Sequence, residues 1–169
     1  MKKIVKRLSG WKHLCLLITV LVFLAGCGAG KTLVMKPPEM KVRVSSVDIS
    51  EEIPTVNVPE DVRTKFQEKL NHLLYKEGTF KKGSDLKIKY RFIQYDPGNQ
   101  FTRWFSGGIG NAGEGSLTIE VKYFDATGKE LSTIHTEGKI QSGFFGGSFD
   151  FALEKAAREI VEYTKNSFQ

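Results

Sequence analysis

In residues 86–92, Leu-Lys-Ile-Lys-Tyr-Arg-Phe, apolar and cationic side chains alternate without a break. Successive side chains of a β-strand point to opposite faces, so this alternation predicts a strand with one buried face and one charged face. Residues 117–123, Leu-Thr-Ile-Glu-Val-Lys-Tyr, repeat the pattern. Together the two stretches predict a sheet that carries its core on one face and leaves the other face open to solvent.

Two further strands are expected on the same criterion. Residues 41–45, Lys-Val-Arg-Val-Ser, alternate polar and apolar side chains, and another strand runs from about residue 130 to 141. A hairpin loop is predicted at residues 125–129. Residues 96–99 predict a type II turn, because proline and glycine occupy the positions that such a turn favours.

Two segments have helical periodicity. The first helix begins at Pro59, followed by Glu60 and Asp61, because proline suits a first turn and acids favour the helix dipole there. Gly78 ends it, and Ser148 caps the second helix. The element order β-α-β-β-β-α predicts an α+β fold. We expect a two-layer sandwich in which a four-stranded mixed sheet carries both helices on one face.

The N-terminus has the parts of a secretory signal. Residues 1–12 carry five cations and no acid, and residues 14–25 form an apolar run. Crossing a bilayer takes about 20 apolar residues, so this run is too short for a comfortable transmembrane helix. We therefore interpret residues 1–26 as a signal peptide that is removed.

The sequence Leu24-Ala25-Gly26-Cys27 resembles the lipobox of bacterial lipoproteins. The resemblance implies cleavage just before Cys27 and a covalent lipid on this residue, which makes it an anchor rather than a catalyst. Residues 27–40 are then the lipid anchor with a tether, and residues 41–169 form one α+β domain. Gly28, rather than Asp, follows the lipidated residue. This resembles sorting to the outer membrane, facing the periplasm, if the source is Gram-negative.

The formal net charge of +6 belongs mostly to the signal. Removing residues 1–26 takes away five of the 25 Lys and Arg residues and none of the 19 Asp and Glu residues, which leaves 20 cations against 19 acids. The resulting net charge of +1 offers no general attraction to nucleic acid, so no nucleic-acid partner is expected. Cys15 leaves with the signal and Cys27 is lipidated, so we expect no disulfide in the mature monomer.

Two glycine motifs resemble nucleotide-binding loops but lack the context of such loops. Residues 25–32, Ala-Gly-Cys-Gly-Ala-Gly-Lys-Thr, resemble a phosphate loop, yet Pro37-Pro38 would stop the helix that must follow. Residues 108–113 match Gly-x-Gly-x-x-Gly, yet a strand follows them. The two mature histidines, His72 and His135, are isolated and do not make a zinc site. We expect no nucleotide, no metal, no catalytic residue and no cofactor beyond the covalent lipid.

Two surfaces are candidates for binding. The loop at residues 101–115 is long and rich in glycine and aromatic residues, which favours either partner binding or local packing. Its candidate contact residues are Arg103, Trp104, Phe105, Gly107, Gly108 and Gly110. The polar face of the predicted sheet is basic, which favours either recognition of a glycan or lipid or an ordinary solvated face. Its cations are Lys41, Arg43, Lys87, Lys89, Arg91 and Lys122.

Several segments together resemble a bacterial lipoprotein family known by domain of unknown function forty-four ten. These segments are residues 96–99, Arg103-Trp104 with Gly107, Gly108 and Gly110, residues 125–129 and residues 143–147. The resemblance covers about residues 40–166; it implies the fold and the location but no activity. We expect a lipid-anchored envelope protein that catalyses nothing and binds another envelope protein. Glycan or lipid recognition by the basic sheet face is the alternative.

Overall fold

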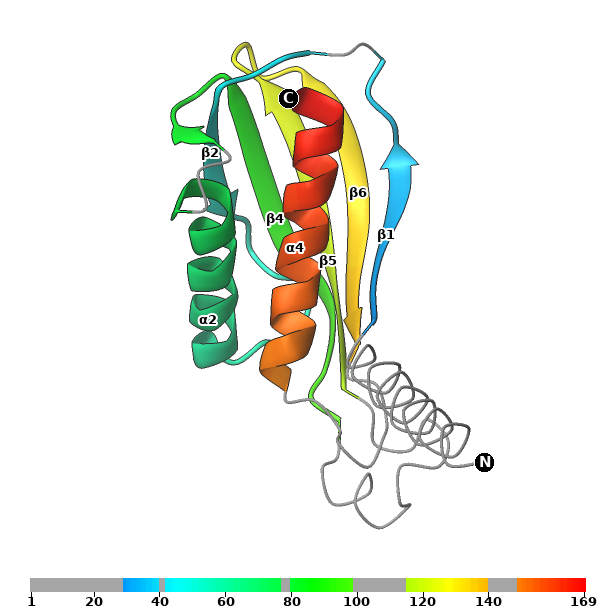
Figure 1. Cartoon of the computed structure of the whole chain (residues 1–169). Helices are drawn as coiled ribbons and strands as arrows, with labels where there is room; N and C mark the ends of the chain where they lie inside the picture. Colours follow the sequence, from blue (N-terminus) through cyan, green and yellow to red (C-terminus); the bar gives the residue numbers. More distant parts are fainter. Residues whose placement is uncertain (1–28, 40–41, 77–79, 99–114, 140–148) are drawn as a thin grey trace, which may run out of the picture.

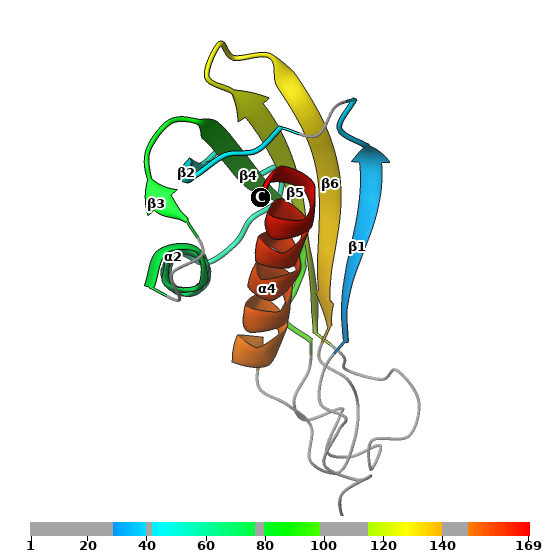
Figure 2. The same ribbon diagram turned by 45° about the horizontal axis from the view of Figure 1, so that its top comes forward.

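Two helices cover one face of a six-stranded sheet (Figures 1 and 2). The computed structural model describes residues 29–39, 42–76, 80–98, 115–139 and 149–169. The strands are β1 (Ala29–Lys36), β2 (Ser46–Glu51), β3 (Lys81–Lys82), β4 (Leu86–Asp96), β5 (Ser116–Asp125) and β6 (Glu130–Lys139). The helices are α2 (Glu60–Asn71), which η1 (His72–Lys76) continues as a π-helical turn, and α4 (Phe149–Phe168). The α+β class is confirmed, but the sheet has six strands and not the expected four.

The strand order is β1-β6-β5-β4-β2-β3. The sheet is mixed, because β2 is parallel to β3 and β4 whereas the other neighbours are antiparallel. Its centre consists of the strands that alternation predicted. In β4, Leu86 and Ile88 are fully buried under the helices, whereas Lys87 and Lys89 lie half-buried on the opposite face. We call this opposite face, which carries neither helix, the outer face.

The strand expected at residues 41–45 is wrong, because the strand beside β4 is β2, which begins at Ser46. β2 pairs in parallel with the first half of β4. Just before it, the backbone N–H of Val44 donates to the carbonyl oxygen of Phe168 at 2.8 Å. The end of α4, and not a neighbouring strand, therefore satisfies this part of the backbone.

β1 lies within the segment that we interpreted as a tether. It pairs antiparallel with β6 from Ala29, opposite Lys139, to Lys36, opposite Thr133. Its middle residues 33–35 are all exposed, so burial imposes no alternation on them and the strand has no sequence periodicity. β3, with only two residues, is the other strand that was not expected.

The helix boundaries follow the expected chemistry where the structure describes them. Pro59 precedes α2 with a φ of −55°, and Glu60 and Asp61 lie in the first turn. Their negative charges face the positive end of the helix dipole. The expected helix end at Gly78 and the expected cap at Ser148 both lie outside the described residues.

The predicted hairpin loop between β5 and β6 is confirmed. The Asp125 carboxylate accepts hydrogen bonds from the backbone N–H groups of Thr127 and Lys129, both at 2.9 Å. Gly128 has a φ of 91°, a conformation that favours glycine. In the other predicted turn, Gly98 has a φ of 68°, as the third position of a type II turn requires.

One end of the sheet brings four strand ends together. Ala29, Lys139, Ser116 and Asp96 lie side by side in register across β1, β6, β5 and β4. We call this row the lower end, because it lies toward the bottom of Figure 1. α4 also begins at the lower end, whereas the C-terminus and the hairpin loop lie at the opposite, upper end (Figure 1).

Candidate functional site

The residues predicted for lipidation and for the binding loop lie outside the described part of the chain. They are Gly26 and Cys27 at the cleavage site and Arg103, Trp104, Phe105, Gly107, Gly108 and Gly110 in the loop. The structure does describe the residues on either side of both segments. β1 begins at Ala29, and the loop leaves from Gly98 and returns at Gly115, next to the lower end.

The outer face is organised around one carboxylate, that of Glu120 on β5. Register places Glu120 between Arg91 on β4 and His135 on β6. The distance from Arg91 Nη2 to Glu120 Oε1 is 2.6 Å, and that from His135 Nε2 to Glu120 Oε2 is 3.4 Å. Lys122 Nζ approaches Glu120 Oε1 at 3.6 Å. We call these four residues the Glu120 cluster.

Three neighbours keep the Glu120 carboxylate charged. Its side chain is only 14% exposed, and this burial by itself raises the pKa. The nearby charges of Lys122 and Arg91 and the hydrogen bond with His135 outweigh burial, so the pKa of Glu120 lies below its ordinary value. A carboxylate held in this form at neutral pH is suited to binding the sheet together rather than to donating a proton.

The rest of the predicted basic face is balanced by acids. Lys89 Nζ lies 3.6 Å from Glu52, and register places Lys87 opposite Asp48. The structure therefore brings Lys87, Lys89, Arg91 and Lys122 to one face, as predicted, but places acids among them. Arg43 is exposed and precedes β2, so it is not part of a strand, and Lys41 lies outside the described residues. Charge balance leaves this face less attractive to anions than the sequence suggested.

Replacement of Glu120 should reveal its structural role. We expect Glu120→Gln to reduce the free energy of unfolding by about 1 kcal/mol at pH 7, allowing for solvent screening. A carboxylate with a lowered pKa stabilises the fold above its unfolded pKa, near 4.5, and this contribution disappears as the pH falls through the lowered value. Urea unfolding at pH 7 and at pH 3 measures both effects.

The matched control is Glu52→Gln on the same face. Glu52 is 35% exposed and has a single ion pair, with Lys89, so this variant should lose less stability. An equal loss in both variants, or a loss at Glu120 that persists unchanged at pH 3, would show that charge within the Glu120 cluster is not the cause.

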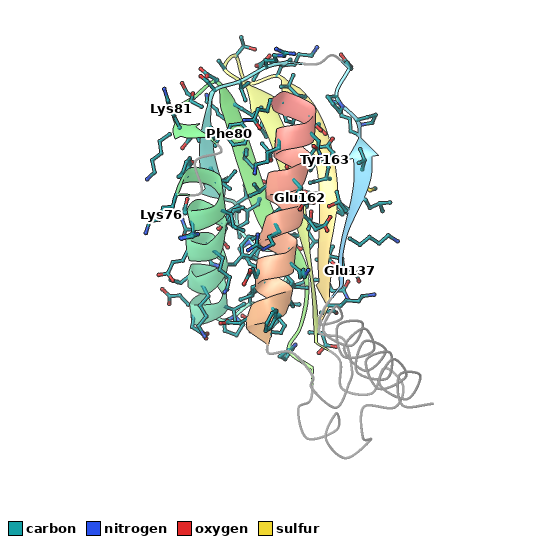
Figure 3. All side chains as sticks on the ribbon, in the orientation of Figure 1. Lys76, Phe80, Lys81, Glu137, Glu162 and Tyr163 are labelled. Carbon is teal, nitrogen blue, oxygen red and sulfur yellow. The ribbon has the colours of Figure 1, made fainter. Side chains whose placement is uncertain are left out.

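The second candidate surface is an edge of the sheet. In the described part of the chain, β3 forms one edge and β1 the other. β3 has only two residues, both exposed lysines, which are typical devices for protecting an edge. β1 has eight residues, and Leu33, Val34 and Met35 in its middle are 53%, 44% and 53% exposed. Lys81 and β1 lie on opposite sides of the molecule (Figure 3). We call residues 31–36 the β1 edge.

Contacts with β6 and α4 hold β1 in place. The Thr32 hydroxyl donates to the carboxylate of Glu159 on α4 at 2.8 Å. The Ser132 hydroxyl on β6 donates to the carbonyl oxygen of Lys36 at 2.7 Å, and the Lys36 ammonium donates to the carbonyl oxygen of Glu130 at 3.0 Å. The β1 edge is therefore a built part of the sheet with exposed apolar side chains. Sequence analysis missed it, although an apolar Leu-Val-Met run between two lysines was a signal.

A groove between α2, η1 and α4 is the largest described hollow. It has a volume of about 390 Å³ and is lined by Glu68, Lys69, His72, Leu73, Glu154 and Arg158. Arg158 and Glu154 pair across one helical turn at 2.9 Å. Within the described ranges, no three His, Cys, Asp or Glu side chains are grouped so that they could hold a metal ion. No helix among the described residues is both long and apolar enough to cross a membrane.

Fold and surface together define a two-layer α+β domain with a charge-balanced outer face and one unprotected sheet edge. Residues 36–143 match the model of the family described as Domain of unknown function (DUF4410), which is 108 of the 169 residues. The chain belongs to this family. No curated protein matches the sequence.

Solved structures share the fold at low sequence identity. The PelC dodecamer from Paraburkholderia phytofirmans is 10% identical, with a TM-score of 0.53 over 83% of this chain and 99% of that chain. A variant of that dodecamer is 12% identical, with a TM-score of 0.52 over 79% and 95%. A minor lipoprotein from Acinetobacter baumannii is 14% identical over 72% and 94%, with a TM-score of 0.38. At such identities, the PelC structures show a common fold alone.

Proposed function

We propose that the chain is a lipid-anchored protein of the cell envelope whose domain binds another envelope protein and catalyses nothing. One observation carries the proposal: β1 begins at Ala29, two residues after the predicted lipidation site Cys27. Two residues span about 7 Å at most. A lipid on Cys27 would therefore fasten the sheet itself to the membrane surface. If the source is Gram-negative, Gly28 favours the outer membrane, with the domain facing the periplasm.

The anchor also sets the orientation of the domain. Because β1 is in register with its neighbours, a lipid near Ala29 brings the whole lower end toward the bilayer. A strand of ten residues such as β5 is about 33 Å long, so the hairpin loop at the upper end lies that far from the lipid. The candidate loop with Trp104 leaves and re-enters the sheet next to the lower end. A partner that contacts this loop must therefore itself lie at the membrane.

The carboxylates support binding rather than catalysis. Those with a shifted pKa are Asp85, Glu120 and Asp125, and in each the shift is downward. Hydrogen bonds from Ser46 and Ser45 lower the pKa of Asp85, and one from the Thr127 hydroxyl lowers that of Asp125. General acid catalysis at neutral pH needs the opposite shift. The PelC neighbours are dodecamers, which supports an assembly role for a domain of this fold.

The orientation can be measured on the full chain in liposomes. Cys15 leaves with the signal and the Cys27 thiol carries lipid, so an introduced cysteine is the only thiol available for a fluorescent label. We would compare Asp150→Cys at the start of α4 with Ala126→Cys in the hairpin loop, both exposed. With a quencher on the lipid headgroups, the label at position 150 should be strongly quenched and the label at position 126 hardly quenched.

Flotation of Cys27→Ser with liposomes separates anchoring from orientation. The unlipidated variant should stay in the soluble fraction, because the acyl chains supply the membrane affinity. If the variant floats like the natural chain, the proposed anchor is wrong. If the natural chain floats but both labels are quenched equally, the anchor stands and the proposed orientation is wrong.

A further inference from the structure

We infer that the β1 edge is a docking site at which an extended segment of another protein joins the sheet as an additional strand. The two edges of the sheet differ in the feature that matters. β3 is short and lysine-covered, whereas β1 is long and exposes three consecutive apolar residues. Edges of the second kind invite pairing with another chain unless something covers them.

The backbone of β1 offers the main attraction. Along an antiparallel strand, successive residues direct their N–H and C=O groups alternately to one side and to the other. β6 pairs with one side of β1, and no described strand pairs with the other. An incoming strand would pair with these groups, as in recognition by strand addition.

The side chains beside this backbone provide apolar contacts on both faces. Leu33 lies next to His135 on the outer face, and Val34 lies next to Ile134 on the helix face. Met35 follows at the register shift between Val34 and Lys36. An incoming strand with alternating apolar side chains could cover Leu33 with one face and Val34 with the other, because cross-strand neighbours lie within contact distance.

The charges of the edge indicate the chemistry of the partner. β1 contains Lys31 and Lys36, five positions apart, and no acid. Lys31 is exposed, and the side chain of Lys36 is 43% exposed although it pairs with Glu130 at 3.5 Å. Acids directly opposite these lysines would add cross-strand attraction. The edge therefore suits an extended segment with an apolar centre and an acidic residue at each end.

A second copy of the chain does not fit this site, an argument that rests on the proposed function. Two copies anchored through Cys27 in one bilayer have their lower ends at the same surface. Their β1 strands then run in the same direction, so the anchors prevent the antiparallel pairing of two β1 edges. A segment of another protein has no such restriction.

A pair of probe peptides tests the site on the full lipidated chain in nanodiscs. The probes are the labelled hexapeptide Glu-Thr-Val-Ile-Thr-Glu and its counterpart with lysine at both ends. Fluorescence anisotropy should show at least about tenfold tighter binding of the acidic peptide. Leu33→Lys should weaken that binding about tenfold, because a lysine in the middle of an edge opposes strand addition.

Ile53→Lys is the matched control, because Ile53 is also apolar and is 89% exposed but lies outside β1. It should leave the affinity unchanged, and both variants should keep the natural thermal melt. Amide hydrogen exchange within β1 should slow when the acidic peptide binds. Equal affinities for the two peptides, equal effects of the two substitutions, or unchanged β1 exchange would each overturn the site.

Crosslinking in the native membrane tests the choice of partner. A photoreactive residue at position 33 should capture an acidic, extended segment of another protein, identified by mass spectrometry of the crosslinked peptide. Capture of a second copy would overturn that choice. Because the peptide needs no anchor, unlipidated Cys27→Ser protein should bind it with the same affinity. Unchanged peptide binding by a chain that fails to float with liposomes would retain the site while rejecting the proposed anchor.

Discussion

A methyl group added to Gly138 is expected to destabilise the protein by about 3 kcal/mol, among the larger effects of overpacking. Gly138 lies on β6 where α4 crosses it, and a Cβ at this position would overlap the carbonyl oxygen of Ala152. That oxygen belongs to the helix backbone, so relief requires movement of α4 as a whole. Urea unfolding of Gly138→Ala measures the loss as a lower midpoint.

Two other glycines provide controls for this prediction. Gly128 has a φ of 91° but open space around it, so Gly128→Ala carries backbone strain alone and should cost about 1 kcal/mol. At Gly30 an added Cβ would meet the flexible side chain of Glu159 at 2.9 Å, which can move aside. If Gly138→Ala cost no more than Gly128→Ala, α4 and β6 would have to lie farther apart than the structure places them.

This close approach explains why the central strands were predictable and others were not. β4 and β5 each bury one face completely, so their sequences alternate without exception. Residues 41–45 alternate as well, yet only the following residues, β2, pair with β4. Alternation reports an amphipathic segment but not its neighbour. The bond from Val44 to Phe168, at the far end of the chain, excludes residues 42–45 from the sheet, and no local pattern predicts such a contact.

β1 was missed for the opposite reason. An edge strand whose middle residues are exposed on both faces has no burial pattern for the sequence to display. β1 depends on pairing with β6 and on the contact of Thr32 with Glu159, two partners more than ninety residues away. The resemblance of the preceding residues to a lipobox made a tether the natural interpretation.

The candidate sites divide in the same way. The sequence predicted that Arg91 and Lys122 share a face, because that follows from a period of two. It did not predict that Glu120 lies between Arg91 and His135. That arrangement depends on the register of three strands, in which a slip of one residue would reverse every side chain. The predictions for Cys27 and for the loop around Trp104 rest on local motifs, and both residues lie outside the described part of the chain.

The loss of one aromatic ring should have the second large effect. Phe66 on α2 is fully buried, and its ring centroid lies 5.3 Å from that of Tyr90 and 5.4 Å from that of Phe92. Both contacts are edge-to-face, a geometry that aromatic pairs favour. Phe66→Ala removes the ring that joins α2 to β4 and leaves a cavity, so it should lower the free energy of unfolding by about 3–5 kcal/mol. Thermal and urea unfolding measure the loss.

Phe151→Ala on α4 is the matched control, because the same side chain is removed from a helix where it is 47% exposed. Its loss should stay below about 1 kcal/mol, since a half-exposed ring leaves no closed cavity. Comparable losses at the two positions would contradict the packing of α2 on the sheet. Phe66 contacts neither the β1 edge nor the lower end. At a temperature where Phe66→Ala remains folded, the variant should therefore bind the acidic peptide as tightly as the natural chain does, which would separate the stability of the helix layer from binding at the β1 edge.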